Sequence, residues 1–267
     1  GNNTAVGRSA LAAASGADST AVGYQALAVN TGAQNTAVGS GALAANTSGT
    51  PNVAVGYQAL GSNITGVNNV AVGYQSLFNN TNSNNTAMGY GALLTNNSGN
   101  LNVAVGNHCF YFSTGSNNTG VGGNAGQQTS TGDKNTIVGY RALFTNETGS
   151  ENVAMGYNAL QFGTSSQNTA LGSQAMSANI SGTLNTTAGY RSLLSNTAGS
   201  NNVAIGADAA LSVLTSNNTA VGTSALAAAS GANSTAVGYN ALLVNTGASN
   251  TAVGSGALDA NTTGTPN

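Results

Sequence analysis

The sequence predicts an all-β protein, a parallel β-solenoid or β-roll of about sixteen coils, each 16–17 residues long. A motif close to the stretch from Thr20 to Leu27 (TAVGYQAL) recurs along the whole chain, and its Gly returns at every 16th or 17th position from Gly7 to Gly254. A short fixed period is typical of repeats that bury their apolar side chains only by stacking on their neighbours. We therefore expect residues 1–267 to form a single continuous array, with one coil per repeat.

The strand of each coil is expected directly before the repeat Gly. Here the chain reads Thr-Ala-Val or Val-Ala-Val, which alternates as short strands do and is rich in β-branched residues. A Gly in every repeat and Asn-Thr-Gly clusters between repeats leave no uninterrupted stretch for a helix. The Val column of this triplet (Val6, Val22, Val38 and onward) and a Leu column four residues after the Gly (Leu11, Leu27 and onward) are the two sizeable apolar ladders. We expect both to face inward.

Two columns of small residues flank these ladders. Ala stands two residues before the Gly in most repeats and three residues after it in most repeats. Such persistent smallness indicates a close approach, either by another layer of the same coil or by another chain. A further column, four residues before the Gly, holds Asn from Asn3 to Asn250 with only Ser as a replacement. It predicts a ladder of stacked side-chain amides at a turn.

The seventh and eighth repeats carry an irregularity that tests the stacking. Phe110 takes the Leu position of one repeat, and Gly126 takes it in the next. A large ring next to an empty position is what tight packing requires if the two coils touch. We expect these coils to stack directly.

Composition excludes several classes of partner. The chain has 4 Lys and Arg, 6 Asp and Glu and a formal net charge of −2. So few cations cannot neutralise a phosphate backbone or form a polybasic membrane patch, so we expect no nucleic-acid partner and no membrane contact in this segment. One Cys rules out an internal disulfide framework.

A longer repeat overlies the short one. Residues 216–267 match residues 1–52 at 44 of 52 positions, an offset of 215 residues or thirteen coils. We interpret the sequence as an excerpt of a longer tandem-repeat protein.

The Asn-Thr-Ala-Val-Gly-Tyr-Gln-Ala-Leu repeat resembles the head repeats of YadA-like trimeric autotransporter adhesins, and related repeats of bacterial and phage tail-fibre-like proteins. The resemblance covers the whole chain. It implies a left-handed parallel β-roll in a homotrimer, with small residues near the three-fold axis, and we expect the Ala columns to line that axis. Adhesin head repeats are somewhat shorter, so the additional residues here are expected in outer loops such as 46–51.

No catalytic, cofactor-binding or metal-binding residues are expected. His108 and Cys109 are the residues with ligand or nucleophile chemistry, but zinc needs about four such ligands and nucleophilic catalysis needs a base with an orienting group. The carboxylates are too few and too scattered for calcium-binding coils. We interpret His108 and Cys109 as structural residues and expect no enzyme.

Two surface patterns remain open. Eight Tyr form a broken outer column, which either shields its own turns or offers an aromatic stripe to glycans, surfaces or neighbouring fibres; they are Tyr24, Tyr57, Tyr74, Tyr90, Tyr140, Tyr157, Tyr190 and Tyr239. Several Asn-x-Ser/Thr sequons are potential glycosylation sites if the chain is exported, among them Asn2, Asn46, Asn63, Asn79 and Asn146.

These observations favour a structural role. We expect a non-catalytic shaft of an extracellular filament, surface adhesin or virion fibre that associates with copies of itself and contacts a glycan or surface. The alternative is an ice-binding or glycan-binding solenoid, because one face could present ordered Thr such as Thr4, Thr20 and Thr36. Val replaces Thr in that column at 53, 70, 103, 153 and 203, which interrupts the array.

Overall fold

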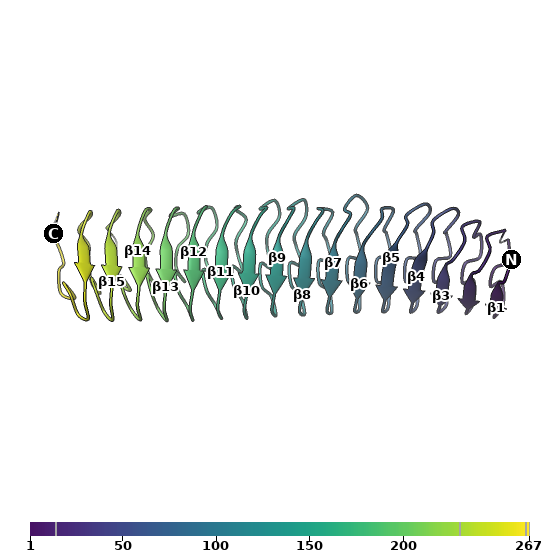
Figure 1. Cartoon of the computed structure of the whole chain (residues 1–267), viewed down its shortest axis with the longest axis horizontal. Coiled ribbons are helices and arrows are strands. Elements are labelled where there is room, and N and C mark those ends of the chain that lie inside the picture. Colours follow the sequence, from purple (N-terminus) through teal and green to yellow (C-terminus); the bar gives the residue numbers. More distant parts are fainter. Residues whose placement is uncertain (14, 230, 265, 267) are drawn as a thin grey trace. The chain divides into compact units, whose positions relative to one another are not determined.

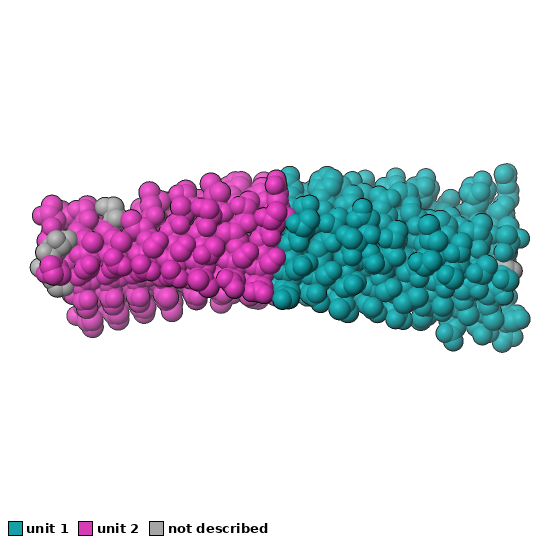
Figure 2. All heavy atoms as spheres, turned by 90° about the horizontal axis from the view of Figure 1, so that it is seen from above, with its two compact units in different colours: residues 1–134 teal, residues 135–267 magenta. Residues whose placement is uncertain are grey.

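The computed structural model describes residues 1–13, 15–229, 231–264 and 266. The chain divides into two compact units, residues 1–134 and residues 135–267 (Figure 2). Each unit is a parallel β-solenoid in which every coil contributes one short strand and each strand pairs with the strand of the next coil (Figure 1). The described residues form about sixteen coils and no helix. The predicted fold class is therefore confirmed.

The strands are three or four residues long and directly precede the repeat Gly, as predicted. Those of unit 1 are β1 (Thr4–Val6), β2 (Thr20–Val22), β3 (Thr36–Val38), β4 (Asn52–Val55), β5 (Asn69–Val72), β6 (Thr86–Met88), β7 (Val103–Val105) and β8 (Thr119–Val121). Those of unit 2 are β9 (Thr136–Val138), β10 (Val153–Met155), β11 (Thr169–Leu171), β12 (Thr186–Ala188), β13 (Val203–Ile205), β14 (Thr219–Val221), β15 (Thr235–Val237) and β16 (Thr251–Val253).

The repeat Gly ends each strand because no other residue fits there. Gly23 has φ +136°, a conformation that is essentially restricted to Gly. A Cβ on Gly23 would also lie 2.6 Å from the carbonyl oxygen of Gly39 in the next coil. The Gly column therefore provides both the turn after the strand and the close contact between coils.

After the Gly, the chain turns through left-handed residues that are not Gly. Gln25 and Leu27 have φ of 56° and 51°, and the corresponding residues of the other coils repeat these values. A left-handed residue with a side chain costs roughly 1–2 kcal/mol. Full burial of a Leu side chain contributes about 1.5–3 kcal/mol, and the Leu27 amide donates a hydrogen bond to the Ala42 carbonyl of the next coil at 3.1 Å. Burial and the bond between coils together offset the strain.

The Leu column lies inside the coil, as predicted, but the prediction for the Val column is wrong. Leu27, Leu43 and Leu60 are fully buried, whereas Val38 and Val55 are 37% and 36% exposed. Side chains alternate along a strand, so the Thr and Val of Thr-Ala-Val share one face and the central Ala takes the other. The coil is narrow, and the inward strand position opposite the buried Leu is usually a fully buried Ala, with Ile137 and Thr187 as larger exceptions. Ala therefore faces inward and Val faces outward.

Both Ala columns belong to the core of a single chain. Ala21 and Ala37 on the strands, and Ala26, Ala42 and Ala59 after the Gly, are fully buried. Of the two explanations for their smallness, close approach by another layer of the same coil is the one found. The Ala columns thus cannot line an axis between chains, and that part of the trimer prediction is wrong.

The predicted Asn column forms a buried ladder, although its hydrogen bonds differ from those expected. The Asn52 amide N–H donates to Asn35 Oδ1 at 2.9 Å, and Asn35 Nδ2 donates to the Gly49 carbonyl at 2.8 Å. The same pattern continues at Asn69 in unit 1 and at Asn168 in unit 2. Each side chain thus mainly satisfies backbone groups of the next coil, rather than pairing only with other side-chain amides.

A second Asn ladder, which was not predicted from the sequence, lies where the outer loops begin. Asn46 Nδ2 donates to Asn30 Oδ1 at 2.7 Å, and Asn63 Nδ2 donates to Asn46 Oδ1 at 2.9 Å. The same side chains close the loops: Asn30 bonds to the Gly32 carbonyl at 2.6 Å and Asn46 to the Gly49 carbonyl at 3.0 Å. The ladder thus accommodates loops of two lengths. Its sequence signal is an Asn two or three residues before a loop Gly.

The irregular coils stack directly, as predicted. Phe110 is fully buried, and its amide donates to the Ala125 carbonyl of the coil that carries Gly126. Room for the ring also comes from Gly120 of β8, which replaces the usual strand Ala. A Cβ on Gly120 would lie 2.5 Å from Phe110 Cε2 and 2.6 Å from Cys109 Sγ. The compensation therefore includes a third residue on the opposite side of the coil.

Two substitutions in one coil test the revised core. We expect Leu60→Ala to destabilise the fold by about 2–5 kcal/mol, because it leaves a cavity at a fully buried position. Val55→Thr should cost much less, because Val55 lies outside the core of the coil and Thr keeps its β-branched shape. Thermal unfolding and amide hydrogen exchange near these residues measure both. If Val55→Thr lowered the free energy of unfolding strongly and Leu60→Ala did not, the assignment of Leu60 to the core and Val55 to the outside would be wrong.

A double-mutant cycle tests the packing around Phe110. Gly120→Ala should destabilise by about 1–3 kcal/mol, because the added methyl meets the Phe110 ring. In the Phe110→Leu background the same change should cost at least about 1 kcal/mol less. Denaturant unfolding gives these free energies, with Gly123→Ala, one residue after the repeat Gly, as the control. Equal costs in both backgrounds would show that Gly120 does not accommodate the ring.

Candidate functional site

The outward side of the strands is the most regular surface of each unit, and we call it the outer strand face. It comprises the first and third residues of each Thr-Ala-Val triplet and its variants. In unit 1, Thr36 aligns with Val53 and Val70 on consecutive strands, and Val38 aligns with Val55. Val53 and Val55 are 38% and 36% exposed. The result is an in-register, uncharged array of methyl and hydroxyl groups, two side chains wide.

The spacing of this array follows from strand geometry. Equivalent side chains of neighbouring coils lie about 4.8 Å apart, and the two columns lie about 6.7 Å apart along the strand. Unlike a pocket, such a surface offers every coil the same chemistry.

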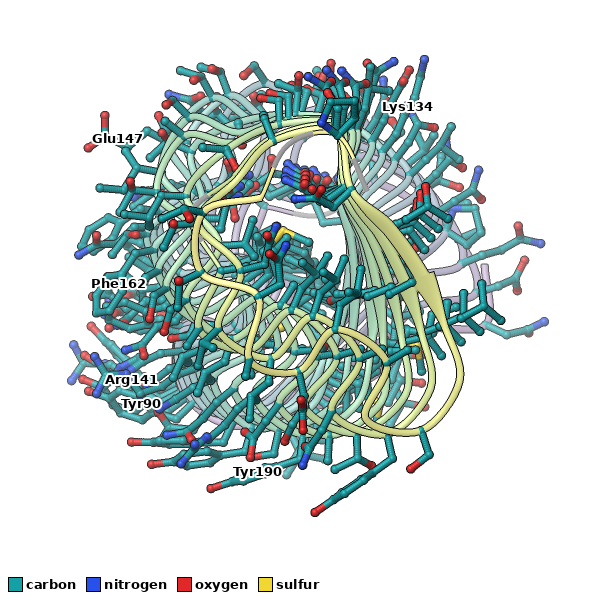
Figure 3. All side chains as sticks on the ribbon, turned by 90° about the vertical axis from the view of Figure 1, so that its left-hand side faces the viewer. Tyr90, Lys134, Arg141, Glu147, Phe162 and Tyr190 are labelled. Atoms are coloured by element: carbon teal, nitrogen blue, oxygen red, sulfur yellow. The ribbon has the colours of Figure 1, made fainter. Side chains whose placement is uncertain are left out.

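The Tyr column lies on a different side of the coil from the strands, and Tyr90 and Tyr190 point outward there (Figure 3). In unit 1 the rings stack along the column: the centroids of Tyr57 and Tyr74 are 5.1 Å apart, as are those of Tyr74 and Tyr90. In unit 2, Tyr140 and Tyr157 stack at 5.9 Å. Within these stacks the ring faces cover one another, so mainly the edges and hydroxyls reach solvent.

The His108 ring extends the stack of Tyr rings in unit 1. Its ring contacts Tyr90 edge-to-face at 5.0 Å and Tyr111 at 4.7 Å, and Tyr111 in turn contacts Phe112 at 4.6 Å. Among the residues that the structure describes, no group of three or more His, Cys, Asp or Glu side chains could hold a metal ion.

Cys109 follows His108 in sequence but lies inside the coil, in the Ala column after the Gly. The side chain is fully buried. Burial raises the pKa of the Cys109 thiol to about 12, against a smaller opposing effect of a backbone hydrogen bond at Val105. The reactive thiolate is therefore scarce at neutral pH.

The sequons divide into buried and accessible ones. Asn46, Asn63 and Asn146 belong to the second Asn ladder and are fully buried, with Nδ2 engaged in hydrogen bonds. A glycan on any of these nitrogens would remove those bonds and could not fit inside the folded coil. Asn2 is exposed and Asn79 is half-buried, so these two sequons remain compatible with glycosylation.

The position two residues after the repeat Gly, which Gln25 occupies in the motif, is called the Gln column. Its charged residues, Arg141, Arg191 and Asp208, lie on the outer surface and are partly exposed. In unit 2, Arg191 Nε and Asp208 Oδ1 of adjacent coils are 2.9 Å apart, with both side chains about one-third exposed. No helix in the described part of the chain is long and apolar enough to cross a membrane.

No protein-family model matches the chain, and no curated protein matches it either. The outer strand face and the Tyr column are therefore the two candidate functional surfaces of the chain.

Cys109 should make stability fall at alkaline pH. A thiol pKa raised from 9.0 to about 12 means that the folded chain holds this proton more tightly than the unfolded chain does. The contribution is fully present below pH 9 and is lost between pH 9 and 12, at about 1.4 kcal/mol per pH unit.

Cys109→Ala, which restores the usual residue of the column, is the matched control. Urea unfolding at a series of pH values should show a smaller alkaline loss for this variant than for the parent. Identical pH profiles would contradict the buried thiol.

Proposed function

We propose that the chain is a non-catalytic structural segment, the shaft of an extracellular filament, surface adhesin or virion fibre. The observation that carries the proposal is the recurrence of the same backbone hydrogen bonds between coils along each unit. Backbone hydrogen bonds, the two Asn ladders and the Leu column connect each coil only to its neighbours, so a solenoid of this kind extends by adding coils. The resemblance to YadA-like head repeats and tail-fibre repeats supports the same role and an exported location, together with a left-handed coil.

Copies of the chain would associate side by side, and the adhesin resemblance favours a homotrimer. Because the Ala columns are buried within one chain, the contact surface must be different. The outer strand face is uncharged and carries exposed apolar side chains such as Val55, Met88 and Val121. Exposed apolar patches are typical of protein–protein contact sites. We place these faces around the axis of the assembly.

Light scattering tests this assembly. We expect the protein in solution to have three times the chain mass of 25.8 kDa. Val55→Lys with Val72→Lys should dissociate it without loss of the circular dichroism spectrum, because charges would enter the interface but not the core. Gln25→Lys with Gln75→Lys is the matched control, since Arg141 and Arg191 already occupy that column. If the unsubstituted chain is folded and monomeric, self-association through this face is excluded.

Ice binding is a second candidate, favoured by the outward orientation of the Thr column. Thr20 pairs in register with Thr36, so hydroxyl and methyl groups repeat regularly along the outer strand face. We expect measurable thermal hysteresis if this candidate is correct, and its loss in a Thr20→Lys, Thr36→Lys variant that remains folded. Val53 and Val70 interrupt the Thr column, so the activity would be modest. Absence of hysteresis in the parent would exclude ice binding.

A further inference from the structure

The Tyr column of unit 1 is interrupted by a single Ser. Ser40 occupies the Tyr position of the coil between those of Tyr24 and Tyr57. Backbone hydrogen bonds fix this order: the Gly41 amide donates to the Tyr24 carbonyl at 2.8 Å, and the Gln58 amide donates to the Ser40 carbonyl at 2.9 Å. The column therefore lacks one ring between two Tyr side chains.

Unit 2 contains the same interruption. Ser173 stands between the coils of Tyr157 and Tyr190. The Gln174 amide donates to the Tyr157 carbonyl at 2.8 Å, and the Arg191 amide donates to the Ser173 carbonyl at 3.0 Å. We call each Tyr-Ser-Tyr arrangement a ring slot.

The outer faces of the slot rings in unit 1 are occupied. Arg8, from the preceding coil, lies over the Tyr24 ring with its Cζ 5.3 Å from the centroid. On the far side of the slot, Tyr57 stacks on Tyr74 at 5.1 Å. These two ring contacts therefore come from outside the slot, and Ser40 is the residue that the intervening coil places in the column between the two Tyr.

Unit 2 mirrors this arrangement. Tyr157 is backed by Tyr140 at 5.9 Å, and the Arg191 Cζ lies 5.4 Å from the Tyr190 centroid. Because Arg191 is paired with Asp208 of the following coil, it covers the side of Tyr190 away from Ser173. Both slots thus have two braced aromatic walls and a short hydroxyl side chain between them.

The width of a slot corresponds to one ring. Rings on adjacent coils of this column lie 5.1 Å apart in the Tyr57–Tyr74–Tyr90 stack. Rings two coils apart are therefore separated by about twice that distance, which leaves space for one intervening ring in the geometry of the stack. The four wall residues are close to half exposed, so their rings can be reached from solvent; their exposed fractions are 44% for Tyr24, 45% for Tyr57, 52% for Tyr157 and 51% for Tyr190.

We propose that each ring slot binds one pyranose ring of a glycan, sandwiched between the two Tyr rings. The face of an aromatic ring carries negative charge density and attracts the positively polarised C–H groups of a sugar. A saturated sugar ring is thicker than an aromatic one and suits the separation of the walls. The Ser40 or Ser173 hydroxyl at the base can donate to or accept from a ring hydroxyl.

The sandwich also predicts which sugars bind. Both faces of the sugar must present C–H groups, which requires all ring substituents to be equatorial. A β-glucoside or β-N-acetylglucosaminide meets this condition. A β-galactoside has an axial hydroxyl at C4, which would place a polar group against a Tyr face. This inference goes beyond the proposed shaft and does not depend on it, since a shaft without ring slots would be equally sound.

Titration with methyl β-glucopyranoside, followed by NMR of the Tyr ring protons, tests the proposal. We expect two sites per chain with a dissociation constant on the order of 1 mM, as for a small ligand with few atoms. Ser40→Tyr fills one slot with the ring that other coils carry, and should leave one site. Ser40→Tyr with Ser173→Tyr should leave none.

The control variant is Thr223→Tyr, which makes the same kind of change at a Tyr-column position next to Ala207 and not between two Tyr. It should retain both sites. Tyr24→Ala, which removes one wall, should weaken its slot at least tenfold and provides a second test if a Ser→Tyr variant does not fold. Methyl β-galactopyranoside should bind at least tenfold more weakly. No response of the parent protein, unchanged binding in the Ser40→Tyr, Ser173→Tyr variant, or equal affinity for the galactoside would overturn the proposal.

Discussion

The narrow interior of the coil is the constraint on which the rest of the structure depends. One side chain per coil, usually Leu, fills the space between the strand and the opposite turns, and the buried strand residue across from it is usually Ala. The same closeness brings the Gly column of one coil against the next, where a Cβ would collide with backbone. The backbone reaches this geometry through left-handed residues at Gln25 and Leu27 and their equivalents. Their strain is tolerated because every coil repeats the compensating burial and hydrogen bonds.

Buried hydrogen bonds of Asn side chains add to the small apolar core in holding neighbouring coils together. Two buried Asn ladders satisfy backbone and side-chain amides of neighbouring coils. Where Ser113 and Thr129 replace Asn in the second ladder, their buried hydroxyl oxygens have no hydrogen-bond partner. The core and the Asn ladders connect the coils, so the exposed side chains are not needed for the fold of the coil. The outer strand face and the Tyr column can vary without disturbing the core, which is where both the proposed self-association and the ring slots are located.

The sequence was sufficient to predict the solenoid, its coil length, the strand positions and the Leu core, because a fixed period leaves few alternatives. It was insufficient to place the Val column. Both Val and Ala are compatible with either face of a strand, and only the width of the coil, set by Leu27 and its equivalents, decides between them. Asn46 was read as a sequon because its burial depends on how the loop closes. Gly120 replaces Ala in the strand column, but its contact with Phe110 joins residues on opposite sides of the coil and does not follow from the repeat period.

The Asn that closes each outer loop has a consequence for how such a chain tolerates change. Asn30 spans two residues to Gly32 and Asn46 spans three to Gly49, while the strands on either side keep their register. Differences in coil length are thus absorbed at one corner and are not transmitted along the stack. This corner is therefore the natural place to graft a foreign peptide, and a protein engineer could display a series of such peptides at intervals of about 4.8 Å.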